Sequence, residues 1–244
     1  MHHVVLDLWS RGSSPLHRFD PRAKIIALFV FLIALATARR GIPLLGSGLM
    51  AVLALGFLWG RIPLSKALLR AGLILPFTGV FVAISWLAGD PGRALSLAVK
   101  SYLSALAVIL VVATTPLPVL LAGFRSLGAP SFILQVGQFL YRYLFVISEE
   151  AQHMRKAAAA RGASVRQWVA QGERFRASAG ALAVLFARSY SRAEDVHHAM
   201  LARGFSGNLP VLEASRFRRS DWLFAITGSA LVLIVRLAAE GIAR

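Results

Sequence analysis

Long apolar segments without an ionisable side chain restrict the fold of this sequence more than any other feature. Gly41–Gly60, Ala71–Gly89 and Ser101–Phe124 contain no Asp, Glu, Lys, Arg or His. Each reaches the roughly 20 residues with which an α-helix crosses about 30 Å of hydrocarbon. Hydrophobic residues make up 57% of the 244, more than a water-soluble domain of this size can bury. The sequence therefore predicts an all-α integral membrane protein.

Two further segments bring the expected number of transmembrane helices to about five. Ile25–Ala38 is short, but Lys24 and the Arg39-Arg40 pair at its ends can extend toward the interface and lengthen the effective span. Trp222–Ala239 carries Arg236 near its end and is interpreted in the same way. Glycine and proline between long apolar runs favour helices over the alternating strands of a barrel, which are about 10 residues long.

The orientation follows from the distribution of basic residues. Residues 1–23 are polar and contain no cleavable signal peptide, so we expect the N-terminus to lie in the cytoplasm. Three basic residues lie between the second and third apolar segments, whereas the loop after the third holds Asp90 and Arg93. The positive-inside rule then places the former loop in the cytoplasm. Arg39-Arg40 falls on the outer side in this topology and argues mildly against it.

We divide the chain into a cytoplasmic N-terminal segment (1–23), four transmembrane helices (24–124), a cytoplasmic region (125–220) and a last transmembrane helix with the C-terminus (221–244). The formal net charge is +16, and 14 of the 27 basic residues lie in the cytoplasmic region. Positive-inside bias accounts for that excess, so we expect no nucleic-acid partner. Because the chain has no cysteine, disulfides, thiolate metal sites and cysteine nucleophiles are excluded.

Two long amphipathic helices are expected in the cytoplasmic region. The first begins near Pro130 and the second covers roughly Ala179 to Arg203, after a polar connection from Ser164 to Ser178. Apolar or small residues recur at the three-and-four spacing of one helical face. In the first helix these are Phe132, Val136, Phe139, Tyr143, Ile147, Ala151, Met154 and Ala158; in the second they are Leu182, Leu185, Ser189, Ala193, Val196 and Met200. We expect the two helices to pack as a hairpin or to cross.

Each amphipathic helix ends in the same tripeptide, Ala160-Arg161-Gly162 and Ala202-Arg203-Gly204. Extending each stripe by three residues reaches the arginine, which places both arginines near the packed face. A helix cap explains one such run, because a cation complements the helix dipole and glycine commonly terminates a helix. Two copies at matched helix ends favour docking, in which each guanidinium binds a carboxylate or carbonyls in a partner's groove.

Three parts of the chain resemble the transmembrane T component of energy-coupling factor (ECF) vitamin and metal importers, the EcfT/CbiQ family. The resemblance covers most of the chain. Its specific parts are Ser14-Pro15-Leu16-His17-Arg18-Phe19-Asp20-Pro21-Arg22-Ala23-Lys24, Tyr141-Arg142-Tyr143 with Glu149-Glu150, and the blocks that end in the two tripeptides, above all Arg192-Ala193-Glu194-Asp195-Val196 through Ala199-Met200-Leu201-Ala202-Arg203-Gly204-Phe205.

The resemblance implies a multi-pass, non-catalytic subunit of a bacterial cytoplasmic (inner) membrane. Its coupling helices would dock into two ABC ATPase subunits, and its apolar face would hold a small substrate-binding membrane subunit, the S component. Arg161 and Arg203 would be the docking residues, and Ala160, Gly162, Ala202 and Gly204 would permit close approach. ATP and Mg would bind the partner ATPases, and this chain would bind no cofactor. The absence of a phosphate-binding Gly-x-x-x-x-Gly-Lys-Ser/Thr motif agrees with that assignment.

The cargo stays open at this point. An Arg-rich, Lys-poor chain with an extended cytoplasmic region favours cobalt or nickel, with biotin or another vitamin as the alternative. His197 and His198 are neighbours on one helix and point to different faces, so we expect no metal site.

Two other classes of protein are less favoured. An integral-membrane enzyme would have to use the acidic pairs Glu149-Glu150 and Glu194-Asp195, which fit solvated ion pairing. A stand-alone permease would need ionisable residues within its spans, and the four main apolar segments contain none. Pro76, Pro116 and Pro118 are instead expected to kink or end helices.

Overall fold

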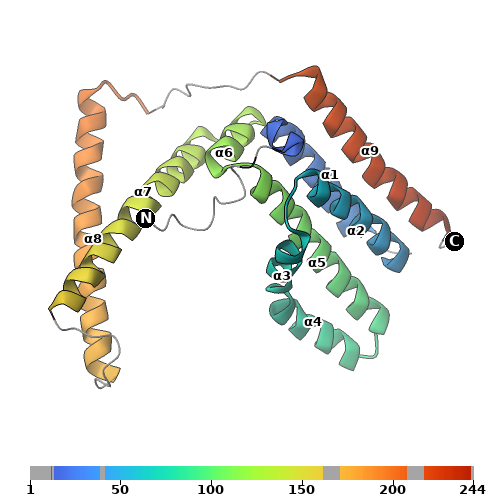
Figure 1. The fold of residues 1–244 in the computed structure, drawn as a ribbon, viewed down its shortest axis with the longest axis horizontal. Helices are drawn as coiled ribbons and strands as arrows, with labels where there is room; N and C mark the ends of the chain where they lie inside the picture. Colours follow the sequence, from blue (N-terminus) through green and yellow to red (C-terminus); the bar gives the residue numbers. More distant parts are fainter. Residues whose placement is uncertain (1–11, 13, 39–41, 162–170, 208–216, 243–244) are drawn as a thin grey trace. The chain divides into compact units, whose positions relative to one another are not determined.

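A computed structural model describes residues 12, 14–38, 42–161, 171–207 and 217–242. Every regular element within these residues is helical (Figure 1). The chain divides into two compact units. Unit 1 comprises Met1–Ala129 and Glu213–Arg244, and unit 2 comprises Pro130–Leu212. The described residues thus agree with the all-α prediction.

Four long helices of unit 1 pack against one another: α1 (Pro21–Thr37), α2 (Ile42–Trp59), α5 (Pro91–Thr114) and α9 (Arg219–Ile242). A short 3-10 turn, η2 (Pro15–Arg18), precedes α1 and contacts α2. The sequence starts α1 and α5 in the same way, with an Asp-Pro pair. Asp20 accepts a hydrogen bond from Arg22 N at 2.9 Å, and Asp90 accepts one from Arg93 N at 2.9 Å. Each aspartate satisfies an otherwise unpaired amide of the first turn.

Glycines on α2 allow these helices to approach closely. A Cβ atom on Gly46 would lie 2.8 Å from Val99 of α5, and one on Gly48 would lie 2.6 Å from Val235 of α9. Small residues at helix interfaces are typical of membrane proteins, where close packing drives association. The buried core between the helices is aliphatic and aromatic, with Phe31, Leu35, Leu45, Leu49, Leu53, Phe57, Leu103, Leu106 and Val232 among its members.

The predicted span Ala71–Gly89 is broken near its start. The structure has two helices here, α3 (Leu64–Gly72) and α4 (Leu75–Leu87), which are bent by 56° at the intervening break. Pro76 lies in the first turn of α4 and has no N–H to donate to the carbonyl of Gly72, so a straight helix cannot continue through it. Figure 1 shows α4 running beside α5, and every residue of α4 is at least partly exposed.

The predicted span Ser101–Phe124 is also shifted. Helix α5 begins ten residues earlier, at Pro91, and ends at Thr114; a separate helix, α6 (Leu117–Ser126), begins after Pro116. The prolines therefore end helices as predicted. The shift brings Arg93 and Lys100 into a membrane helix that we expected to lack ionisable residues. Lys100 Nζ donates to the carbonyls of Ala36 at 3.1 Å and Ala38 at 2.6 Å, which pairs otherwise unbonded groups at the end of α1.

Among the described residues, three helices are long and apolar enough to cross a membrane, namely α2, α5 and α9, and the bent pair α3 and α4 makes a fourth candidate. The remaining predicted span, Ile25–Ala38, corresponds to α1, which has 17 residues, fewer than the roughly 20 that a span normally needs. Large apolar side chains remain exposed on these helices, including Phe29, Leu55, Phe81 and Ile234. Such exposure suits contact with lipid tails.

Unit 2 consists of α7 (Ser131–Ala160) and α8 (Gln171–Ala202), which cross each other in Figure 1. Helix α8 starts at Gln171, eight residues before the predicted Ala179, so the second half of the expected polar connection is helical. From Gln171 to Ser178 the segment contains no proline and a single glycine, so no residue within it prevents a polar helix from forming.

Candidate functional site

The second tripeptide forms a complete C-terminal helix cap. Helix α8 ends at Ala202, and Gly204 has φ +76°. Gly204 N donates to Leu201 O at 2.9 Å, and Phe205 N donates to Met200 O at 3.0 Å. This pair of bonds defines a Schellman motif, in which the left-handed position favours glycine. Capping is thus one established role of Gly204, and Arg203 lies exposed at the resulting tip.

The first tripeptide also ends its helix. Ala160 is the last residue of α7, and Arg161 N donates to the carbonyls of Ala157 and Ala158, both at 3.2 Å. The Arg161 side chain is exposed. Gly162 lies outside the described residues. Both arginines therefore occupy the exposed ends of long helices, in a position that a partner protein can reach.

The apolar stripe of α8 is largely confirmed, and that of α7 only in part. On α8, beyond position 175, the partly buried residues are Leu185, Ser189, Val196 and Met200, all predicted members of the stripe, whereas the members Leu182 and Ala193 are exposed. On α7 the stripe members Phe139, Tyr143, Ala151 and Met154 are partly buried, but Phe132, Val136, Ile147 and Ala158 are exposed. Extension of the packed faces to the arginines is not observed, because both arginines are exposed.

The crossing of α7 and α8 contains an ion pair. Arg188 Nη1 of α8 bonds Glu150 Oε1 of α7. Val146, Leu185 and Ser189 lie around this pair. Glu150 belongs to the acidic pair Glu149-Glu150, for which we expected ion pairing, and its partner is Arg188. Because side-chain exposure is 61% for the arginine and 34% for the glutamate, we expect the pair to fix the crossing geometry while adding little stability.

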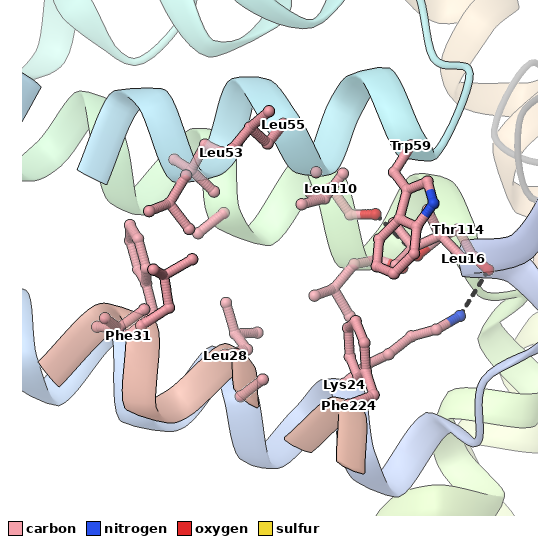
Figure 2. A pocket seen from close by; sticks show the side chains of 18 of the residues that line it. Leu16, Lys24, Leu28, Phe31, Leu53, Leu55, Trp59, Leu110, Thr114 and Phe224 are labelled. Atoms are coloured by element: carbon pink, nitrogen blue, oxygen red, sulfur yellow. Dashed lines mark hydrogen bonds between the residues drawn. The ribbon is translucent and has the colours of Figure 1, made fainter. Parts of the chain in front are cut away.

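Helices α6 and α9 precede and follow unit 2 in the chain. A buried polar cluster in unit 1 joins α1 to the residues before α6 and to the first turn of α9. Asp20 N donates to Asp221 Oδ1 of α9 at 3.1 Å. Lys24 Nζ donates to Thr114 O at 3.1 Å and to Thr115 Oγ1 at 2.9 Å, immediately before α6. The five residues are each at most 6% exposed. Figure 2 shows Lys24 and Thr114 joined at one end of an apolar cavity.

This cluster was missed in the sequence. We expected Lys24 to extend from the end of a span toward solvent, but only 3% of it is exposed. A signal was present: Asp20 and Lys24 are spaced i, i+4 at a helix start, which puts both on one face. The spacing does not reveal the partners on α5 and α9, because these lie 90 and 201 residues further along the chain.

No group of three or more residues that could hold a metal ion occurs in the described part of the chain. The rings of His197 and His198 are 6.0 Å apart and tilted by 53°. Glu194 and Asp195 lie on the exposed surface of α8. Within the described residues, then, the features available for recognition are helix ends, an interhelical ion pair and apolar surface.

The fold and the site define a class of protein: an all-α membrane protein with two crossed amphipathic helices that each end in an exposed arginine. Comparison with known proteins agrees. The family model for CbiQ, cobalt transport protein, matches residues 12–212. The chain is 30% identical to the cobalt transport protein CbiQ of Rhodobacter capsulatus over 67% of its own length and 69% of that protein.

Two further relatives are energy-coupling factor transporter transmembrane proteins EcfT. The Bacillus selenitireducens protein is 28% identical, over 90% of this chain and 89% of its own length. The Bacillus subtilis protein is 27% identical, over 98% of this chain and 97% of its own length. The chain belongs to the EcfT/CbiQ family, the transmembrane components of energy-coupling factor transporters.

Proposed function

We propose that this chain is a coupling subunit that transmits ATP-driven movement from two ABC ATPase subunits to a small substrate-binding membrane subunit. The observation that carries the proposal is the pairing of two long crossed helices, each with an exposed arginine at its end. Arg161 and Arg203 would each bind a groove of one ATPase. A guanidinium suits this task because it is permanently charged and donates in a fixed planar geometry.

Closure of an ATPase pair on ATP would move the two docking points relative to each other. The Glu150–Arg188 pair would keep the crossing of α7 and α8 in place while the helix ends move. The displacement would then reach the membrane helices along the chain through α6 and α9, whose neighbouring residues bind α1 in the buried cluster. ATP hydrolysis, with its magnesium ion, would take place in the partner subunits, and the N-terminus would lie in the cytoplasm of a bacterial cell.

The decisive experiment is co-purification from native membranes in mild detergent. Arg161→Glu with Arg203→Glu should abolish retention of the ATPases by the tagged chain. Arg155→Glu with Arg176→Glu is the matched control, because it makes the same charge change at two exposed positions of the same helices. Equal ATPase retention by both double variants and the unaltered chain would refute docking through the tripeptides.

For the cargo, we propose cobalt or nickel. The name of the Rhodobacter capsulatus relative and that of the family model both refer to cobalt transport. The EcfT relatives carry no cargo in their names, so a vitamin is the alternative. Uptake of radiolabelled cobalt, nickel and biotin into cells that carry the complete transporter separates the two, and biotin uptake without metal uptake would overturn the assignment.

A further inference from the structure

A cavity of about 660 Å³ lies inside unit 1 between α1, α2, α5 and α9. Its wall is apolar except for Lys24, two threonines and the edge of Trp59 (Figure 2). Both threonine hydroxyls are already used: Thr114 bonds Leu110 O at 2.9 Å, and Thr227 bonds Leu223 O at 2.7 Å. Ordered water needs two to four polar partners, so this lining suits an apolar occupant.

The cavity has the length of part of a hydrocarbon chain. Along α1 its wall runs from Lys24 to Phe31, a rise of roughly 10 Å at 1.5 Å per residue. That length fits within one leaflet, whose hydrocarbon is about 15 Å thick. An acyl chain can therefore lie along the cavity.

The cavity is open on one side. Leu55, Leu58 and Trp59 line it from α2 and are themselves 62%, 68% and 55% exposed. Because α2 is one of the helices apolar enough to cross the membrane, the opening faces lipid. A void of this size left empty would forfeit the dispersion contacts of its lining, so a lipid chain entering from the side stabilises it.

One end of the cavity carries Lys24, which lies beside the buried carboxylates of Asp20 and Asp221. Figure 2 shows Leu16, Lys24 and Trp59 gathered at this end, with Phe31 toward the other. The ring of Phe19 lies 6.3 Å from that of Trp59, which holds the η2 segment against the end of α2. Two exposed arginines, Arg18 and Arg61, therefore lie within two residues of the cavity wall at this end.

We propose that the cavity binds one acyl chain of an anionic phospholipid and that Arg18 and Arg61 bind its headgroup phosphate. Arginine suits phosphate because its guanidinium forks onto two oxygens. Lys24 uses two of its three N–H groups on Thr114 and Thr115. The site binds a lipid at the same end of the bundle as the buried polar cluster.

Trp59 provides a direct reporter. The other four tryptophans, Trp9, Trp86, Trp168 and Trp222, are replaced by phenylalanine, and the protein is reconstituted into vesicles of phosphatidylglycerol and phosphatidylethanolamine in which one or the other lipid is brominated. We expect brominated phosphatidylglycerol to quench Trp59 more strongly at equal mole fraction. Attraction of each arginine to an anionic headgroup corresponds to about a fivefold preference, so Arg18→Gln with Arg61→Gln should remove most of the difference.

A second variant tests the cavity itself. A Cβ atom on Gly228 would lie 4.0 Å from Ala27, an ordinary contact, so Gly228→Leu fills the cavity and should lower the quenching of Trp59 and reduce its difference between the two lipids. The matched control is Gly79→Leu on α4, where a Cβ meets nothing within 4 Å. A protein that keeps only Trp86, which is 65% exposed on α4, reports on bulk lipid. Equal quenching of Trp59 by both lipids in the unaltered protein would overturn the proposal, and so would quenching of Trp59 that Gly228→Leu leaves unchanged.

Discussion

Asp20 and Asp221 lie 201 positions apart in the sequence, yet the backbone N–H of Asp20 donates to Asp221 Oδ1 at 3.1 Å. The other oxygen of Asp221 accepts from Arg218 N at 2.8 Å. Asp221 is the third residue of α9, so its carboxylate caps its own helix and the start of α1 together. One side chain thereby joins the first long helix of the chain to the last.

The contribution of Asp221 to stability can be measured by removing the acceptor of the two backbone amides that it binds. Asp221→Ala leaves both N–H groups without this acceptor in a buried place, and we expect it to destabilise the protein by about 1–3 kcal/mol, because unpaired buried donors lose their hydration. Asp221→Asn keeps one acceptor oxygen and should be milder. Thermal unfolding in detergent gives the comparison. Equal midpoints for the alanine variant and the unaltered chain would mean that the bonds contribute nothing.

Lys24 should be coupled energetically to Thr115, to which its Nζ donates at 2.9 Å. Lys24→Met preserves much of the side-chain volume but leaves the Thr114 carbonyl and Thr115 hydroxyl without their donor, so we expect a loss of about 1–3 kcal/mol. Thr115→Val alone should cost less. If the bond is specific, the double variant is less destabilised than the sum of the two single variants, which a double-mutant cycle from unfolding curves measures. Strict additivity would refute the coupling.

The helical character of the apolar segments was predictable here, but the points where each helix begins, breaks and ends were not, for a physical reason. A run of uncharged residues reports where a chain can contact lipid, but a helix also includes residues that pair with other elements. Lys100 lies within α5 because the end of α1 supplies two carbonyls for it. Lys24 lies buried in α1 because Thr114 and Thr115 lie opposite. In the sequence, each lysine stands directly before an apolar segment, Lys24 before Ile25–Ala38 and Lys100 before Ser101–Phe124.

The second tripeptide shows the opposite case, in which the local sequence was enough. Glycine after the last helical residue predicts a left-handed cap from backbone sterics alone, and Gly204 adopts it.

The break between α3 and α4 depends on Pro76, a residue that we expected to kink or end a helix. The 56° bend between the two helices could not be predicted from Pro76 alone. It depends on the packing of α4 beside α5 and on the burial of Ala67 and Ala71 of α3 in the core.

The Glu150–Arg188 pair should affect coupling more than stability. Because both groups are partly or largely exposed, replacing either should change stability by less than about 1 kcal/mol. Glu150→Arg places two cations at the crossing of α7 and α8, and we expect it to lower the amount of substrate transported per ATP hydrolysed in the reconstituted complex. Combining it with Arg188→Glu restores opposite charges. Failure of the exchanged pair to recover the transport ratio would show that the ion pair does not set the crossing.

Gly204 separates the capping role of the tripeptide from docking. Gly204→Ala forces a Cβ into φ +76° and should cost about 1–2 kcal/mol at the end of α8. Asparagine tolerates this conformation, so Gly204→Asn should keep the helix end while placing a larger side chain beside Arg203. If a partner approaches closely there, both variants lose ATPase retention on co-purification, although only the alanine variant has a weakened helix by hydrogen exchange. If Gly204 serves as a cap alone, the asparagine variant retains the ATPases as well as the unaltered chain does, and the close approach proposed for the two tripeptides is wrong.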